Sequence, residues 1–200
     1  MSGQTAFAEY VLGPSDYDVY STILDKWFPV DYQKIVVIRS RTALGCSLKD
    51  INEELAFVAS SMAGLRPETI NDFMAKNIDT YLLENYFIYE NLPSAFVSHD
   101  EIAGFFCYED GWKKFYRRYA DFKGLITFSR VGFNLYGNQA LLYMASQWRD
   151  FSGAGIYVLL NRDDAGIWSI QQQVRVWNSW LPEEPNFPFS RPADQMRPVL

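Results

Sequence analysis

Hydrophobic and polar positions alternate most regularly in the last third of the chain, where they predict four consecutive antiparallel strands. The four segments are rich in β-branched and aromatic residues, and clusters of turn-forming residues separate them. They span Leu125–Phe133, Ala140–Gln147, Gly155–Asn161 and Ile167–Trp180. A curved meander of this kind needs helices to cover it. The sequence therefore predicts an α+β fold, with helices packed on one face of a curved, mostly antiparallel sheet that ends in a C-terminal four-strand meander.

Five segments before residue 120 have the apolar spacing of amphipathic helices. They are predicted to begin at Ser15, Ser47, Pro67, Ser98 and just after Asp110. Ser98 and Glu101 form the best capping box of the chain, and Ser15 with Asp18 has the same polarity. Because glycine commonly ends helices, Gly64 is the predicted C-cap of the second helix. These helices are expected to form the layer that covers the meander.

Two further strand predictions concern the core and a polar position. The apolar run Ile35–Ile38 predicts a short strand that is buried on both faces. Alternation in the last strand predicts that one set of side chains faces the helices, namely Trp168, Ile170, Val174 and Val176. The opposite face then carries Gln171, Gln173 and Arg175. Gln172 interrupts the apolar set, so it is either a satisfied buried amide or part of a polar pocket.

Length and composition predict one domain followed by a tail. Two hundred residues fit a single α+β domain over residues 1–180. Residues 181–200 contain five of the nine prolines and almost no periodicity, which predicts a proline-rich C-terminal tail. Phe187 and Phe189 give this tail apolar surface to bury, so we expect it to dock partly on the domain.

The overall charge narrows the range of partners. A formal net charge of -6 argues against a sequence-independent nucleic-acid binder, which needs a positive field. No apolar run is long enough for a membrane span, and residues 1–9 lack the features of a signal peptide. The chain is therefore expected to be cytoplasmic, or a secreted or periplasmic protein whose signal has been removed. Cys46 and Cys107 either pair in an oxidising compartment or remain free thiols.

Few residues of the chain suggest catalysis. His99 is the only histidine, and its place in the first turn of a capped helix predicts a surface residue that is not catalytic. A single histidine excludes a multi-histidine metal site, and no cofactor is expected. Arg130 follows two apolar residues on one strand face, where it would close a cavity and bind a carboxylate of a ligand or of the protein itself. The candidate ligand-binding residues are Arg130, Gln172 and Tyr143.

The predicted helix after Asp110 has a high local concentration of cations. Its aromatic residues fall on one face, and the opposite face carries Lys113, Lys114, Arg117 and Arg118. Such a basic stripe is either a solvated face or a docking patch for an acidic partner.

Several short motifs resemble those of a known group of proteins. They are Thr69–Phe73 with Asn77, Gly111-Trp112 with Phe115 and Tyr119, Ser129–Asn134, Gln139–Leu141, Gly153–Gly155, and Trp168–Ile170 with Trp177. On these residues, the chain resembles conserved bacterial proteins of uncharacterised function, often exported, over residues 17–180. The helices and long strands also resemble cone-shaped α+β folds of the NTF2 or cystatin type. Such folds host isomerases, dehydratases, binding proteins and interaction modules.

These observations lead to three hypotheses for function. The first is a non-enzymatic binding module whose aromatic-lined concavity accepts a small molecule or a peptide. The second is an NTF2-like enzyme that uses Tyr, Arg or carboxylate groups, although the usual Asp–His pair is not recognisable. The third is a protein-interaction module that uses its aromatic surface and its tail. A pocket with convergent polar groups favours the first two, and a large exposed apolar patch favours the third.

Overall fold

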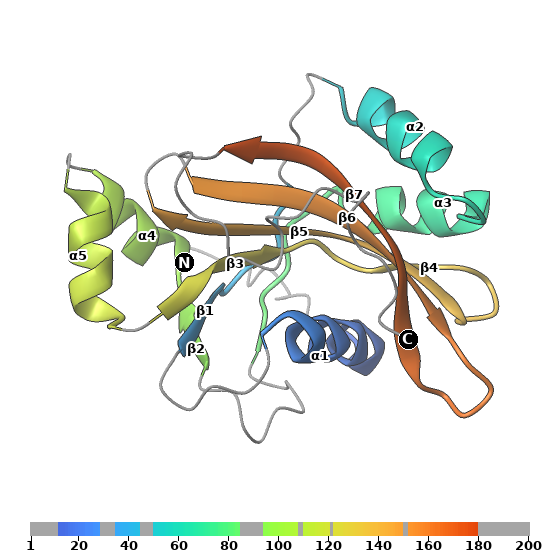
Figure 1. The fold of residues 1–200 in the computed structure, drawn as a ribbon, viewed down its shortest axis with the longest axis horizontal. Helices are drawn as coiled ribbons and strands as arrows, with labels where there is room; N and C mark the ends of the chain where they lie inside the picture. Colours follow the sequence, from blue (N-terminus) through green and yellow to red (C-terminus); the bar gives the residue numbers. More distant parts are fainter. Residues whose placement is uncertain are drawn as a thin grey trace, which may run out of the picture.

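The computed structural model describes residues 12–28, 35–44, 50–84, 94–107, 110–120, 122–149 and 152–179. These residues form five helices and seven strands (Figure 1). In chain order, the elements are α1 (Pro14–Trp27), β1 (Ile35–Arg39), α2 (Ile51–Ser61), α3 (Pro67–Lys76), β2 (Ser94–Val97), α4 (His99–Phe106), α5 (Gly111–Arg118), β3 (Phe122–Phe128), β4 (Gly132–Phe133), β5 (Gln139–Arg149), β6 (Ser152–Arg162) and β7 (Trp168–Ser179). The predictions made for Cys46 and for the tail at 181–200 lie outside the described residues.

The strands form one open sheet of mixed direction. The strand order is β2-β1-β3-β5-β6-β7, and β4 also pairs with β5. β1 is parallel to β2 and to β3, whereas the remaining pairings of the described strands are antiparallel. The predicted α+β class and the C-terminal meander are therefore confirmed (Figure 1).

The first predicted strand of the meander is divided into β3 and β4. Between these two strands, side chains from α1 and from the end of α3 bind the backbone. Asn77 Oδ1 accepts from Arg130 N at 2.8 Å, and Asp16 Oδ1 accepts from Val131 N at 3.0 Å. Polar side chains thus satisfy the backbone donors at the point where the strand leaves the ladder.

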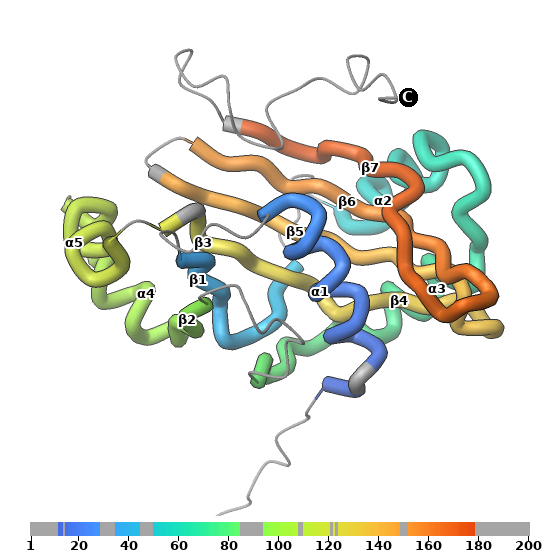
Figure 2. Tube along the Cα trace, turned by 60° about the horizontal axis from the view of Figure 1, so that its bottom comes forward, coloured from blue at the N-terminus to red at the C-terminus, as the bar shows by residue number. Residues whose placement is uncertain are grey.

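Both faces of the sheet are apolar, and helices cover both (Figure 1, Figure 2). α1 packs on one face, in a buried cluster that includes Val36 and Ile38 of β1. The intervening Val37 points to the opposite face, where α4 and α5 pack. α2 and α3 pack on the same face as α4 and α5, against β5 and β6. The expected helical layer thus holds for four of the described helices. α1 differs because the central strands carry apolar residues on both sides.

The predicted side-chain direction in β7 is wrong for half of the strand. Trp168 and Ile170 pack with the α1 cluster, whereas Val174 packs with α2 and α3 on the other face. A register shift between Leu159 and Leu160 of β6 leaves one residue of β7 without a counterpart. Because side chains alternate with a period of two, this β-bulge moves the following residues to the other face.

The helix starts agree with the sequence pattern at Ser98 and differ from it at two other positions. Ser98 Oγ accepts from Glu101 N at 3.1 Å, as in the predicted capping box. α1 begins one residue before Ser15, so Ser15 lies inside the helix and does not cap it. The N-cap of α2 is Asp50, three residues beyond the predicted Ser47, because the Asp50 carboxylate accepts a backbone N–H of the first turn.

Candidate functional site

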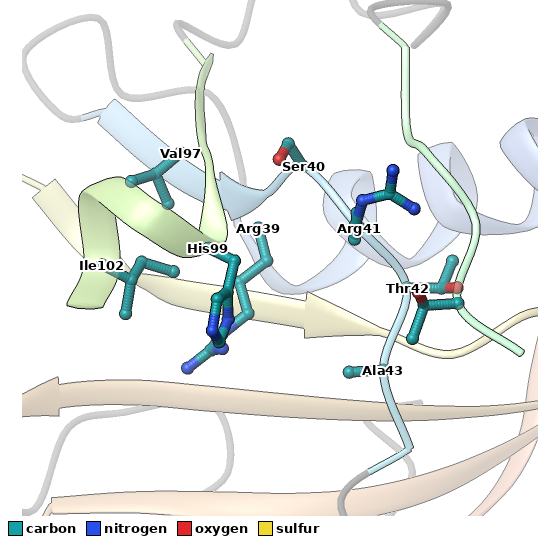
Figure 3. A pocket seen from close by; sticks show the side chains of 9 residues that line it. Arg39, Ser40, Arg41, Thr42, Ala43, Val97, His99 and Ile102 are labelled. Carbon is teal, nitrogen blue, oxygen red and sulfur yellow. The ribbon is translucent and has the colours of Figure 1, made fainter. Parts of the chain in front are cut away.

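A pocket of about 200 Å³ lies at the carboxyl end of β1 (Figure 3). Its lining comes from residues 39–43, which end β1 and continue beyond it, and from Thr80, Val97, His99 and Ile102. β1 and β2 are parallel, so their carboxyl ends meet at one edge of the sheet, and α4 begins immediately after β2. The carboxyl ends of parallel strands are a common place for ligand sites in α/β sheets.

Arg39 contributes a partly buried cation to this pocket. Its backbone pairs with Val97 of β2, which holds the side chain next to the start of α4. The Nε atom is buried and has no hydrogen-bond partner among the described residues. Burial lowers the pKa of the Arg39 guanidinium from its ordinary value, but an arginine stays charged in proteins. A buried donor without a partner needs an explanation, and an acceptor on a ligand is one.

His99 is the second polar group that converges on the pocket. It is the first residue of α4, and Ser98 caps the helix by accepting from Glu101 N. In Figure 3 the imidazole of His99 and the guanidinium of Arg39 point in the same direction, whereas Arg41 points away from them. The N-terminus of a helix also favours negative charge. The predicted exposure of His99 in the first helical turn is confirmed, but its place beside this pocket was not predicted.

Backbone hydrogen bonds on both sides fix the segment that lines the pocket. Ser40 N donates to Val97 O at 2.9 Å, and Leu83 N donates to Ser40 O at 2.8 Å. Thr42 and Tyr81 exchange a pair of bonds, in which Thr42 N donates to Tyr81 O and Tyr81 N donates to Thr42 Oγ1, both at 2.9 Å. The pocket is therefore built from a segment with little freedom to rearrange.

A contact between α4 and α5 keeps a nearby carboxylate away from the pocket. Glu101 follows His99 by two residues, and its Oε1 accepts from Tyr119 Oη at 2.8 Å. Burial, followed by the hydrogen bond to Glu101, raises the pKa of Tyr119 to about 12. The hydroxyl of Tyr119 thus engages the carboxylate and fixes the first turn of α4 on α5.

Arg130 lies outside this pocket and binds a carboxylate of the protein itself. Its Nε and Nη2 atoms donate to the two oxygens of Asp16, each at 3.3 Å. The guanidinium also lies 4.5 Å from the ring centroid of Tyr81, in a cation–π contact. Burial lowers the pKa of Arg130, but the hydrogen bond and the charge of Asp16 outweigh that effect and raise it overall. The sequence left open whether Arg130 binds a carboxylate of a ligand or of the protein itself. In the structure it binds the carboxylate of Asp16.

Tyr143 and Gln172 lie on the other face of the sheet, apart from Arg130. Tyr143 is fully buried, and its hydroxyl accepts from Trp177 Nε1 at 2.8 Å. The side-chain amide of Gln172 accepts from Ala63 N at 3.0 Å and donates to Ala63 O at 2.6 Å. Gln172 is therefore a satisfied amide that joins β7 to the end of α2. The three candidate ligand-binding residues do not converge on one site.

A buried carboxylate and a tyrosine lie together beneath α2. Tyr157 Oη donates to Glu54 Oε1 at 2.9 Å, and the ring of Tyr157 lies 5.3 Å from that of Tyr143. All three residues are fully buried. These are the residue types that the enzyme hypothesis requires. Since solvent does not reach them, we assign them to packing between α2 and the sheet.

The sequence contained two separate indications of the pocket. Arg39 follows directly on the apolar run Ile35–Ile38, and a capping box places His99 at a helix start. What joins these two observations is the parallel pairing of β1 with β2, in which Arg39 lies opposite Val97. β2 has only four residues, and such a short strand carries no periodic pattern that would predict its partner or register.

Three other sequence-based expectations can be compared with the described residues. Cys107 is an exposed free thiol. No group of three His, Cys, Asp or Glu side chains that could hold a metal ion occurs among the described residues. Within the same ranges, none of the helices combines the length and apolar character needed to cross a bilayer.

Comparison with known proteins adds no family or relative to this description. No protein-family model, no curated protein and no solved structure matches the chain. We therefore infer the function of this chain from its pocket and its surface.

Proposed function

We propose that the protein is a binding module that holds a small anionic ligand, carrying a carboxylate or phosphate group, in the pocket at the end of β1. The observation that carries this proposal is the buried Arg39 Nε, which lacks a hydrogen-bond partner among the described residues. A carboxylate or phosphate oxygen supplies the missing acceptor and compensates the partly buried charge.

The size and lining of the pocket support a small ligand recognised by charge. A volume of about 200 Å³ is below the roughly 300–1,000 Å³ of sites for drug-sized ligands. The described lining consists of aliphatic, hydroxyl and cationic side chains and of His99. Aromatic contacts, which the sequence led us to expect in a concavity, are thus not part of this proposal.

Binding is a better match than catalysis for the residues present. Arg39 cannot exchange a proton at physiological pH, which suits a guanidinium that holds an anion. Of the Tyr and carboxylate groups described above, Tyr143, Tyr157 and Glu54 are fully buried, and Tyr119 and Glu101 are engaged with each other.

The single histidine of the chain makes the proposal testable by NMR. Because His99 is the only histidine, its imidazole gives one assignable set of ring signals. We expect titration with inorganic phosphate or with acetate to shift these signals in a saturable way. Acetamide, the uncharged counterpart of acetate, should leave them unchanged.

Matched arginine variants test whether Arg39 is responsible. Arg39→Gln should weaken the anion titration by about ten-fold or more, as expected for loss of a charge-assisted hydrogen bond. Arg66→Gln removes an exposed arginine outside the pocket and should leave the titration within about two-fold. Equal effects of the two variants, or no saturable shift with either anion, would refute the proposal.

A further inference from the structure

The exposed face of α5 concentrates positive charge in a chain that is otherwise acidic. We call this surface the basic face; it consists of Lys113, Lys114, Arg117 and Arg118. These are four of the 18 Lys and Arg residues, so the rest of the sequence has 14 cations against 24 carboxylates. α5 itself contains no Asp or Glu. The field of the basic face is therefore opposite in sign to that of the molecule as a whole.

Three of the four cations of the basic face form no salt bridge with a described residue. They are Lys113, Arg117 and Arg118, and all three are exposed. Lys114 is half-buried and bridges to Asp110 at 3.1 Å. The cations occupy positions i, i+1, i+4 and i+5, which places them as a compact group on one side of the helix.

The position of α5 leaves this face accessible to a large partner. α5 lies at one end of the molecule in both views, apart from α1, α2 and α3 (Figure 1, Figure 2). Two partly exposed aromatic residues accompany it, Phe106 at 37% and Tyr116 at 40% exposure. Arginine and aromatic residues are both enriched at protein–protein interfaces, where they contribute much of the binding energy.

The packing of α5 favours a protein partner over a lipid surface. A helix that binds a membrane inserts its apolar face beneath the headgroups. In α5 that face is already used, because Phe115 is fully buried and Tyr119 is 6% exposed in the cluster formed with α4 and the sheet. The cations and the partly exposed Phe106 and Tyr116 remain outside, which suits carboxylates presented by a folded or extended protein segment.

We infer that the basic face of α5 is a docking surface for an acidic segment of a protein partner. Arg117 and Arg118 bind carboxylates, and Phe106 and Tyr116 supply the adjoining apolar contact. This inference is independent of the anion pocket, because it rests on α5 and not on Arg39.

The test measures binding of a fluorescein-labelled synthetic peptide of Asp, Glu and Gly by fluorescence anisotropy. The unmodified protein should bind the peptide, and the affinity should fall as ionic strength rises. Arg117→Glu should weaken binding by about ten-fold or more, and Arg117→Gln by a smaller factor in the same direction. Circular dichroism checks that both variants remain folded.

Lys26→Glu is the matched control for Arg117→Glu. Lys26 is also an exposed cation in the last turn of a helix, so the substitution makes the same change in net charge and opposes a helix dipole in the same way. It should change the affinity by less than about two-fold. Equal losses in the two variants would mean that only net charge matters and would overturn the inference.

Two further arms assign the binding to the right surface and the right class of partner. Arg39→Gln should weaken peptide binding less than Arg117→Gln, which removes the same charge; a larger loss at Arg39 would place the peptide in the pocket and overturn the inference. Vesicles of phosphatidylcholine with phosphatidylglycerol should bind more weakly than the peptide. Tighter binding to vesicles that depends on Arg117 would identify a lipid surface instead, and absence of peptide binding at low salt would also overturn the inference.

Discussion

Two partly buried arginines of this protein have opposite surroundings. Arg130, between β3 and β4, is held by both oxygens of Asp16 and stacks on Tyr81. Arg39, at the end of β1, has a buried Nε without a partner among the described residues. Their pKa values shift in opposite directions: burial lowers that of Arg39, whereas Asp16 overcomes burial and raises that of Arg130. Arg130 is thus a cation that stabilises the fold, whereas Arg39 is a cation that is available to a ligand.

The difference extends to the elements around each arginine. Asp16 and Asn77 hold the backbone of Arg130 and Val131, so α1 and α3 are joined to the sheet through this one position. Around Arg39, backbone hydrogen bonds fix the lining segment, but the buried Nε atom has no hydrogen-bond partner among the described residues. We expect substitutions at Arg130 to change stability and substitutions at Arg39 to change binding.

The largest effect is expected from breaking the buried ion pair. Arg130→Met should lower the free energy of unfolding by about 3–5 kcal/mol, because it leaves the Asp16 carboxylate buried without its partner. Asp16 is 3% exposed, so solvent cannot compensate. Urea denaturation measures the change. The double variant Asp16→Leu/Arg130→Met should recover part of the loss, and a loss below about 1 kcal/mol in the single variant would contradict the structural role.

Alanine substitutions at two glycines test how tightly the region around Arg130 and the region around the pocket are packed. A Cβ atom on Gly132, two residues after Arg130, would lie 2.5 Å from both the backbone N and the Cβ of Phe73 in α3. Gly132→Ala should therefore cost about 3 kcal/mol, at the upper end of overpacking effects. Gly104→Ala in α4, near the pocket, meets nothing within 4 Å and should be neutral or stabilising by up to about 1 kcal/mol. Equal melting temperatures of the two variants would contradict this difference in packing.

The elements of the meander could be predicted because their sequences satisfy several requirements at once. Long β-branched and aromatic runs alternate with turns, and two of those turns place glycine where the backbone needs a positive φ, at Gly137 (64°) and Gly166 (84°). The bulge in β7 could not be predicted, because it depends on how β6 pairs with β7. Coverage of both sheet faces was missed, although the apolar run of β1 indicated burial on both sides, because the helical patterns do not show which face of the sheet each helix covers.

The candidate site was harder to predict than the fold. For Arg130 the sequence allowed two partners, a ligand or an internal carboxylate, and the choice depended on Asp16, which lies 114 residues away. For Gln172 the sequence allowed a satisfied amide or a polar pocket, and the choice depended on Ala63, whose backbone N and O both bind the side-chain amide. Arg39 was missed because its neighbour His99 is brought there by parallel pairing across the sheet. Local patterns carry no information about such contacts.

An alkaline titration tests how α4 is held beside the pocket. The pKa of Tyr119 is about 12, above its ordinary value of 10, so the folded state retains a proton that the unfolded state loses. This contribution to stability is complete below pH 10 and is lost as the pH rises through about 12. The slope should reach at most about 1.4 kcal/mol per pH unit. Tyr119→Phe should show a shallower decline over that range in thermal melts, and identical slopes would mean that Tyr119 does not contribute.

The smallest effect on stability is expected at Arg39, where the comparison with Arg130 is most direct. Arg39→Met keeps the length and apolar stem of the side chain and removes the guanidinium. Since that group is partly desolvated and its Nε has no partner among the described residues, its loss removes a cost and breaks no ion pair. The free energy of unfolding should therefore change by less than about 1 kcal/mol in either direction, while phosphate and acetate no longer shift the His99 signals. Urea denaturation of Arg39→Met and Arg130→Met in the same buffer provides the measurement. If Arg39→Met lowered the free energy of unfolding as much as Arg130→Met, the guanidinium of Arg39 would stabilise the fold. That result would contradict the proposal that it binds a ligand.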